Sequence, residues 1–164
     1  MQPTQTQLKK RIKRWLILLV AGLVLSGITA FPIESELALA MHNLDAFSPK
    51  MQQWLTTIYN AVKTTNAQYP YLSYGTDWLA FAHIIIALIF VGPLRDPVRN
   101  IWVLQFGMIA CVLIFPLALI AGPIRHIPMF WQLIDCSFGV VGIIPLYMAY
   151  RYTKQLGNIK NHSL

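Results

Sequence analysis

Four long apolar runs, separated by polar segments, dominate the pattern of the chain. The first three are uncharged over 19, 17 and 25 residues, and the fourth contains one charged residue, Asp135. A hydrocarbon core about 30 Å thick requires about 20 helical residues, and in lipid a helix satisfies its own backbone hydrogen bonds. The sequence therefore predicts four transmembrane helices, at about 15–33, 77–94, 100–122 and 128–150.

The connection 34–76 contains an amphipathic segment. Ser48 can cap a helix and Pro49 suits its first position. Apolar residues then recur at three- and four-residue spacing, opposite a polar face, which is typical of a helix lying on a membrane surface or covering a bundle. A shorter helix is expected between Pro32 and Phe47. The apolar stripe of the longer helix comprises Met51, Trp54, Leu55, Ile58, Tyr59 and Val62.

The two ends of the chain give further expectations. A basic segment precedes the first run, as in a signal peptide, but the run is long for one and Ile28 is bulky where a cleavage site needs a small residue. We therefore expect a retained span. The segment 151–164 is polar and contains Gly157 and Asn158, so a frayed tail is expected there.

Composition supports an integral membrane protein. Hydrophobic residues make up 56% of the 164 residues, charged residues make up 12%, and the mean hydropathy is +0.52. Soluble domains carry about 25% charged residues. The length suits one membrane domain over 1–164 and leaves no room for a separate soluble catalytic domain. The expected fold class is an all-α integral membrane protein, a four-transmembrane-helix bundle.

The net charge of +7 follows topology. Ten of the thirteen Lys and Arg residues precede the first run, lie between the second and third, or follow the fourth. Under the positive-inside rule both termini are then cytoplasmic, and the amphipathic helix between the first two spans is extracytoplasmic. We expect the plasma (inner) membrane as the location. The basic residues form no folded basic face, so nucleic acid is not an expected partner.

Small residues indicate which helix faces pack together, because close approach of backbones drives association in lipid. On the first span we expect a face of Gly22, Ser26 and Ala30. On the second it is Asp77, Ala80, His83, Ile84 and Ala87. On the third it is Gly107, Cys111, Ala118 and Gly122, and on the fourth it is Pro128, Trp131, Asp135, Gly139 and Gly142.

Asp135 and His83 are the candidate polar pair. An Asp near the centre of a membrane helix costs roughly 2.5 to 3.5 kcal/mol, so it needs a partner. His83 lies about 9 Å inside Asp77, and Asp135 lies about 10 Å inside Pro128, both from the extracytoplasmic end. Similar depth on two inward faces predicts that they meet.

The same end carries four more candidates for a polar pocket, namely Asp77, Glu34, Arg125 and His126. If a metal were bound, its ligands would come from His83, Asp135, Asp77 and His126. However, Glu-x-x-His spacing, typical of metal sites in bundles, does not occur. Cys111 and Cys136 have no C-x-x-C spacing and suit buried apolar positions.

Three functions remain open. In the first, the polar pair fixes helix register in an accessory or complex subunit that acts through a protein partner or further copies of itself. In the second, an outward-facing pocket binds or transports a proton or small ligand. In the third, the chain is an intramembrane enzyme that uses a metal or haem. The absence of a catalytic motif weighs against the enzyme, and no cofactor is specified.

Overall fold

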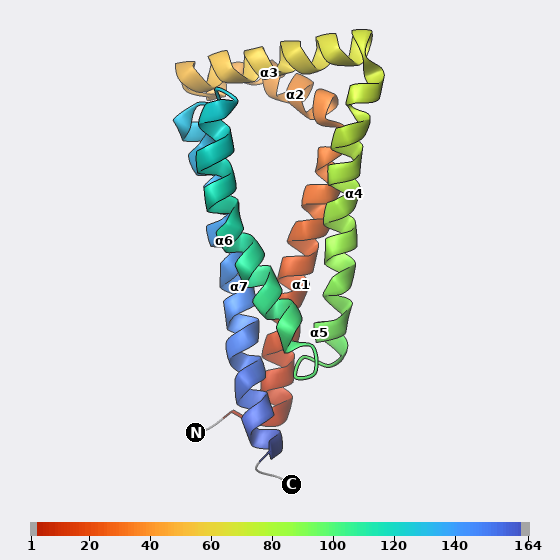
Figure 1. Ribbon diagram of the computed structural model, residues 1–164, viewed down its shortest axis with the longest axis vertical. Helices are drawn as coiled ribbons and strands as arrows, with labels where there is room; N and C mark the ends of the chain where they lie inside the picture. Colours follow the sequence, from red (N-terminus) through yellow and green to blue (C-terminus); the bar gives the residue numbers. More distant parts are fainter. Residues whose placement is uncertain (1–2, 162–164) are drawn as a thin grey trace. The chain divides into compact units, whose positions relative to one another are not determined.

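The computed structural model describes residues 3–161, with the backbone alone at residues 160 and 161, and its regular elements there are all helical (Figure 1). Four apolar stretches are long enough to cross a membrane: Gln5–Ala30, Pro70–Arg95, Ile101–Ile124 and Met129–Ile159. The predicted all-α class and the four candidate spans are thus confirmed. The elements are α1 (Gln5–Ala30), α2 (Ile33–His42), η1 (Leu44–Ala46), α3 (Pro49–Gln68), η2 (Pro70–Leu72), α4 (Tyr74–Ile89), α5 (Val91–Arg95), α6 (Ile101–Ile124) and α7 (Met129–Asn161).

Contacts divide the chain into two units. We call residues 22–87 the central unit, and residues 3–21 with 88–161 the terminal unit. The central unit contains the end of α1, then α2, α3 and most of α4. The terminal unit contains the beginning of α1, then α5, α6 and α7.

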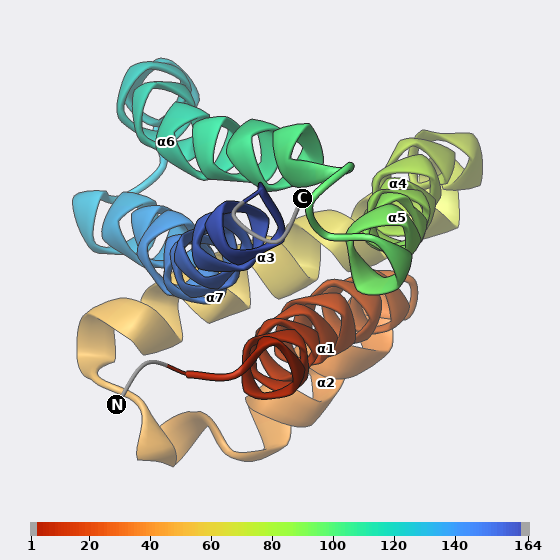
Figure 2. The same ribbon diagram turned by 90° about the horizontal axis from the view of Figure 1, so that it is seen from below.

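In the terminal unit, α6 and α7 form a closely packed antiparallel hairpin, and they lie side by side in both ribbon views (Figure 1 and Figure 2). A Cβ added at Gly139 would lie 2.6 Å from the carbonyl oxygen of Cys111, and one added at Gly142 would lie 3.0 Å from the Cys111 sulfur. At Gly107 the added atom would meet Leu146, at 2.9 Å. The glycines predicted for these two faces therefore do pack between the helices, because only a residue without a side chain fits there.

Several of the most thoroughly buried side chains lie near the two ends of the chain. Leu8, Ile12 and Leu16 of α1 are 0–2% exposed, as are Leu146 and Leu156 of α7. These residues recur at helical spacing along α1 and α7. They contribute to an apolar core in the terminal unit, and Leu8, Ile12 and Leu156 lie outside the runs that the sequence marks as spans.

The prediction of a frayed tail is wrong for residues 151–161, because α7 continues to Asn161, and its last part, 162–164, lies outside the described residues. Thr153 and Leu156 are each 1% exposed, and Gly157 lies near Val98, with a Cβ there 3.7 Å from the valine Cγ1. Burial of these side chains holds the last turns in helical form, although the surrounding sequence is polar.

In the central unit, α2 packs against the amphipathic helix α3. The apolar stripe of α3 is buried or half-buried and includes Leu55, which is 7% exposed, whereas Gln53, Asn60 and Lys63 on the other face are exposed. The predicted start with Pro49 at the first position is confirmed. Ser48 occupies the position before it, but its side chain makes no capping hydrogen bond.

The end of α1 crosses α4 at Gly27. A Cβ at Gly27 would lie 2.8 Å from the carbonyl oxygen of Ala80 and 2.9 Å from Ile84. The face predicted for the second span is therefore the one that packs in the central unit. The face predicted for the first span is wrong, because Gly22 has nothing within 4 Å and is exposed. Apart from Ser26 and Thr29 the residues around both glycines are apolar, so periodicity did not distinguish Gly27 from Gly22.

Candidate functional site

The six residues expected around a polar pocket are divided between the two units. Glu34, Asp77 and His83 belong to the central unit. Arg125, His126 and Asp135 belong to the terminal unit. The approach of His83 to Asp135 therefore stays a prediction from helix faces and depth, and each group has its own local geometry.

His83 lies beside the crossing of α1 and α4. A Cβ at Gly27 would be 3.2 Å from the His83 Cβ, and the ring is half-buried. The ring Nδ1 lies 2.8 Å from the carbonyl oxygen of Leu79, one turn earlier in α4. A carbonyl accepts only from a protonated nitrogen, so this bond places a proton on Nδ1. In the neutral ring, Nε2 is then an acceptor that can receive a proton or a hydrogen bond.

Asp135 is half-buried on α7, beside the face that packs against α6. Its neighbours one residue and four residues further along, Cys136 and Gly139, are both buried. Among the described residues of the terminal unit, no side chain or backbone group forms a hydrogen bond or ion pair with the Asp135 carboxylate. The terminal unit alone therefore leaves this charge without compensation.

Glu34 takes part in a polar bridge of the central unit rather than joining Asp77. The Asn66 Nδ2 of α3 donates to the Glu34 Oε2 of α2 at 2.5 Å, and the Ser73 hydroxyl donates to the Asn66 Oδ1. The bridge connects α2, α3 and the turn before α4. Sequence reasoning missed Asn66 and Ser73. The available signal was that Asn66 continues the apolar stripe of α3 at four-residue spacing from Val62, which makes it a polar residue on a packed face.

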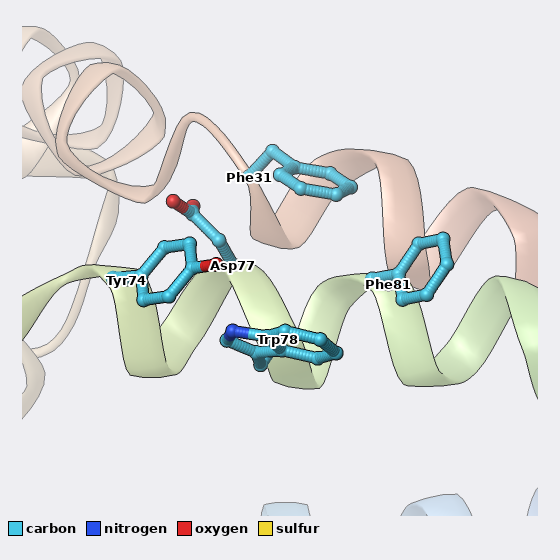
Figure 3. A pocket seen from close by; sticks show the side chains of 5 residues that line it. All are labelled: Phe31, Tyr74, Asp77, Trp78 and Phe81. Atoms are coloured by element: carbon cyan, nitrogen blue, oxygen red, sulfur yellow. The ribbon is translucent and has the colours of Figure 1, made fainter.

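Asp77 lies in the first turn of α4 and lines a small hollow of about 200 Å³ (Figure 3). The other lining residues are aromatic. Tyr74, Trp78 and Phe81 come from α4, and Phe31 comes from the turn after α1. Successive α4 rings meet edge to face, with centroids 5.9 Å apart for Tyr74 and Trp78 and 6.1 Å apart for Trp78 and Phe81. This is a carboxylate bordered by exposed aromatic surface.

Arg125 and His126 form the turn between α6 and α7. The His126 amide donates to the Pro123 carbonyl and the Ile127 amide donates to the Gly122 carbonyl, the two bonds of a Schellman motif. His126 has φ 56°, the left-handed conformation that favours glycine at this position.

Gln132 closes the same turn and was not recognised from the sequence. It is 3% exposed, packs against Gly122, and donates through Nε2 to the Ile127 carbonyl at 2.7 Å. Its Oε1 is buried without a hydrogen-bond partner in the described chain. Gln132 precedes Asp135 by three residues, about one helical turn, and the signal in the sequence was a polar residue within an apolar run.

Within residues 3–161, no three His, Cys, Asp or Glu side chains gather closely enough to hold a metal ion. Cys111 and Cys136 are free thiols, half-buried and buried respectively. The local geometry of the candidate residues consists of a polar bridge at Glu34, the Asp135 carboxylate and the aromatic hollow at Asp77. No model of a protein family, no curated protein and no solved structure matches the chain.

Proposed function

We propose that this chain is an accessory or complex subunit of a membrane assembly, in which a polar contact to Asp135 fixes how the helices associate. The observation that supports it is the half-buried Asp135 carboxylate, which has no hydrogen bond or ion pair from the described residues of its own unit. At membrane depth such a group costs several kcal/mol unless a donor or cation compensates it. We therefore infer a contact to Asp135 from outside the terminal unit.

His83 is our candidate for that contact. Its bond to Leu79 leaves Nε2 as the free ring nitrogen, and a protonated ring would offer an N–H donor there. The pair would then set helix register, as buried polar residues do in helical assemblies. In this arrangement both termini are cytoplasmic and α3 lies on the extracytoplasmic side, where it is available to a protein partner or another copy of the chain.

The test compares Asp135→Asn and Asp135→Leu with the wild-type chain, extracted from membranes with a polymer that preserves surrounding lipid. Native mass spectrometry measures whether each runs as the 18.6 kDa chain alone or in a larger assembly. Asparagine keeps a hydrogen-bonding side chain, whereas leucine removes it. We expect the assembly to persist in Asp135→Asn and to dissociate in Asp135→Leu. Ser137→Leu is the matched control, because Ser137 is exposed on α7 and bonds only to Ile134 within its own helix.

A double-mutant cycle with His83→Ala and Asp135→Leu identifies the partner. A coupling of about 0.5–2 kcal/mol in thermal stability assigns the contact to His83. If the two substitutions are not coupled but Asp135→Leu still loses the assembly, the contact to Asp135 comes from another subunit. A single chain in native membranes that is equally stable in all variants would refute the proposal.

A second function, binding of a small ligand from the extracytoplasmic side, is favoured by the hollow around Asp77. The hollow lies at the beginning of α4, the end that charge distribution assigns to that side. Its lining joins a carboxylate to aromatic rings, which is a lining suited to a ligand. No corresponding observation favours an intramembrane enzyme.

A further inference from the structure

We propose that the hollow lined by Phe31, Tyr74, Asp77, Trp78 and Phe81 binds an organic ammonium group, either a small free amine or the ammonium of a lipid headgroup. This goes beyond the subunit role and does not depend on it, because every lining residue lies within the central unit. Three features support this ligand class: the ring arrangement, the charge and the size.

The aromatic rings present surface of the kind that attracts a cation. Tyr74, Trp78 and Phe81 are four and three residues apart, so they lie on one face of α4, and Phe31 borders the hollow from the turn after α1 (Figure 3). All four side chains are exposed, between 43% for Phe31 and 61% for Tyr74. Aromatic faces carry partial negative charge, and groups of such rings bind quaternary ammonium ions and methylated amines.

Asp77 supplies a full negative charge that no cation on the described central unit neutralises. That unit has four carboxylates and two lysines, a formal net charge of −2. One lysine, Lys63, lies over the ring of Tyr59 with its Nζ 5.6 Å from the centroid. Glu34 is engaged with Asn66. Asp77 is thus the carboxylate beside the rings, and a bound ammonium group would provide its counter-charge.

The volume of about 200 Å³ limits the size of the ligand. Pockets for drug-sized molecules measure about 300 to 1,000 Å³ and bury most of the ligand. A smaller, partly open hollow suits one compact group attached to a larger body or free in solution. An ammonium group with methyl substituents combines apolar contact with a positive charge, and so suits aromatic rings with a carboxylate beside them.

Aromatic side chains at a membrane surface also serve as interfacial anchors, which is the simpler explanation of Tyr74 and Trp78. An anchor interacts with any bilayer and does not need Asp77. A binding site requires Asp77 and the rings together, and it saturates. The experiment therefore tests whether binding saturates and whether it depends on both Asp77 and the rings.

The test uses the full chain in nanodiscs of phosphatidylglycerol, a lipid without an ammonium group, and titrates tetramethylammonium and choline by calorimetry. The variants are Asp77→Asn and Trp78→Leu. Asp45→Asn and Trp102→Leu are the matched controls: Asp45 is another carboxylate of the central unit, and Trp102 is a similarly exposed tryptophan of α6, 59% against 55% for Trp78. Circular dichroism verifies that each variant is folded.

We expect saturable binding that weakens about fivefold to tenfold in Asp77→Asn and in Trp78→Leu and stays unchanged in both controls. A second arm replaces part of the phosphatidylglycerol with phosphatidylcholine or phosphatidylethanolamine and counts, by mass spectrometry, the lipids retained by the protein. Saturable binding in solution identifies a free amine, and Asp77-dependent lipid retention alone identifies a headgroup. Absence of both, or equal binding by all folded variants, would overturn the proposal.

The experiment also separates this site from the subunit role. Asp135→Leu lies in the other unit and is expected to leave the affinity for tetramethylammonium unchanged. Asp77→Asn is expected to leave the mass of the assembly unchanged. Each proposal can therefore fail without the other.

Discussion

The terminal unit and the central unit differ in the interactions that stabilise each of them internally. The terminal unit buries a series of large aliphatic side chains. Its helices α6 and α7 approach so closely that atoms of one helix pack against glycines of the other. In the central unit the buried hydrophobic side chains are Leu55, Ala80 and Ala87, supplemented by one glycine crossing and a polar bridge among its described residues. Dense packing stabilises the terminal unit, whereas the central unit leaves aromatic side chains exposed.

The two units also differ in formal net charge. The central unit has a formal net charge of −2, and the remainder of the chain has +9, with eleven basic and two acidic residues. The positive part contains both chain ends, and the negative part contains the aromatic hollow. The apolar core and the proposed ligand site therefore fall in separate units, whose formal charges have opposite signs.

The largest expected effect comes from removing core volume in the terminal unit. Leu8→Ala should lower the free energy of unfolding by about 2–5 kcal/mol, because Leu8 is fully buried and its loss leaves a cavity. Thermal unfolding in detergent, followed by circular dichroism, measures the change. Leu18→Ala is the control, since Leu18 is 58% exposed on the same helix. Equal effects of the two substitutions would contradict the existence of a core at this end of α1.

Alanine substitutions at glycines compare the two units directly. In both Gly139→Ala and Gly27→Ala the added Cβ meets a backbone oxygen, at 2.6 and 2.8 Å respectively. We expect Gly139→Ala to cost about 2 kcal/mol and Gly27→Ala about 1 kcal/mol, because the less densely packed central unit can shift more easily. Unfolding in increasing denaturing detergent measures both.

Gly22→Ala is the control for both glycine variants. A Cβ there meets nothing within 4 Å, so the better helix propensity of alanine should leave stability unchanged or raise it by up to about 1 kcal/mol. If Gly27→Ala behaved like Gly22→Ala, the crossing of α1 and α4 would be refuted.

A smaller gain is expected at Thr153. Its hydroxyl is buried without a hydrogen-bond partner among the described residues, so Thr153→Val should stabilise the protein by about 1 kcal/mol. Hydrogen exchange of the amides around residue 156 should slow in parallel, if the end of α7 is a folded part of the terminal unit. Fast exchange of these amides in the wild-type chain would instead support a frayed tail.

The smallest effect is expected at the turn between α6 and α7. His126→Gly relieves the left-handed backbone conformation, but glycine also increases the entropy of the unfolded chain. We expect a net stabilisation of roughly 0.5 kcal/mol. His126→Ala keeps the unfavourable conformation and should be no more stable than the wild-type chain. A glycine variant that is clearly less stable would indicate that the His126 side chain makes a stabilising contact.

The sequence predicted what depends on length and hydropathy. The four candidate spans, the amphipathic character of α3 and the packed face of α4 around Ala80 were all recognisable. The packed face of α1 was not, because helix faces toward lipid and toward protein are both apolar, and only the partner helix selects Gly27 over Gly22.

The candidate site was predictable only in part. Asp77 and Glu34 were identified as polar residues at one end of the spans. Asn66, the partner of Glu34, and Ser73, which bonds to Asn66, lie 32 and 39 residues after Glu34, and their approach depends on how α2 and α3 fold back. The hollow likewise requires Phe31 to meet residues of α4, a contact that no local pattern specifies.

The length of α7 has a consequence for the bilayer itself. Its 33 residues correspond to about 50 Å at 1.5 Å per residue, against a hydrocarbon core of about 30 Å. Where the apolar part of such a helix is longer than the local hydrocarbon thickness, the helix tilts. Tilt moves the projecting end sideways through the water, together with the core residues of α1 that pack in the same unit. Membrane thickness would thereby change the position of this projecting end.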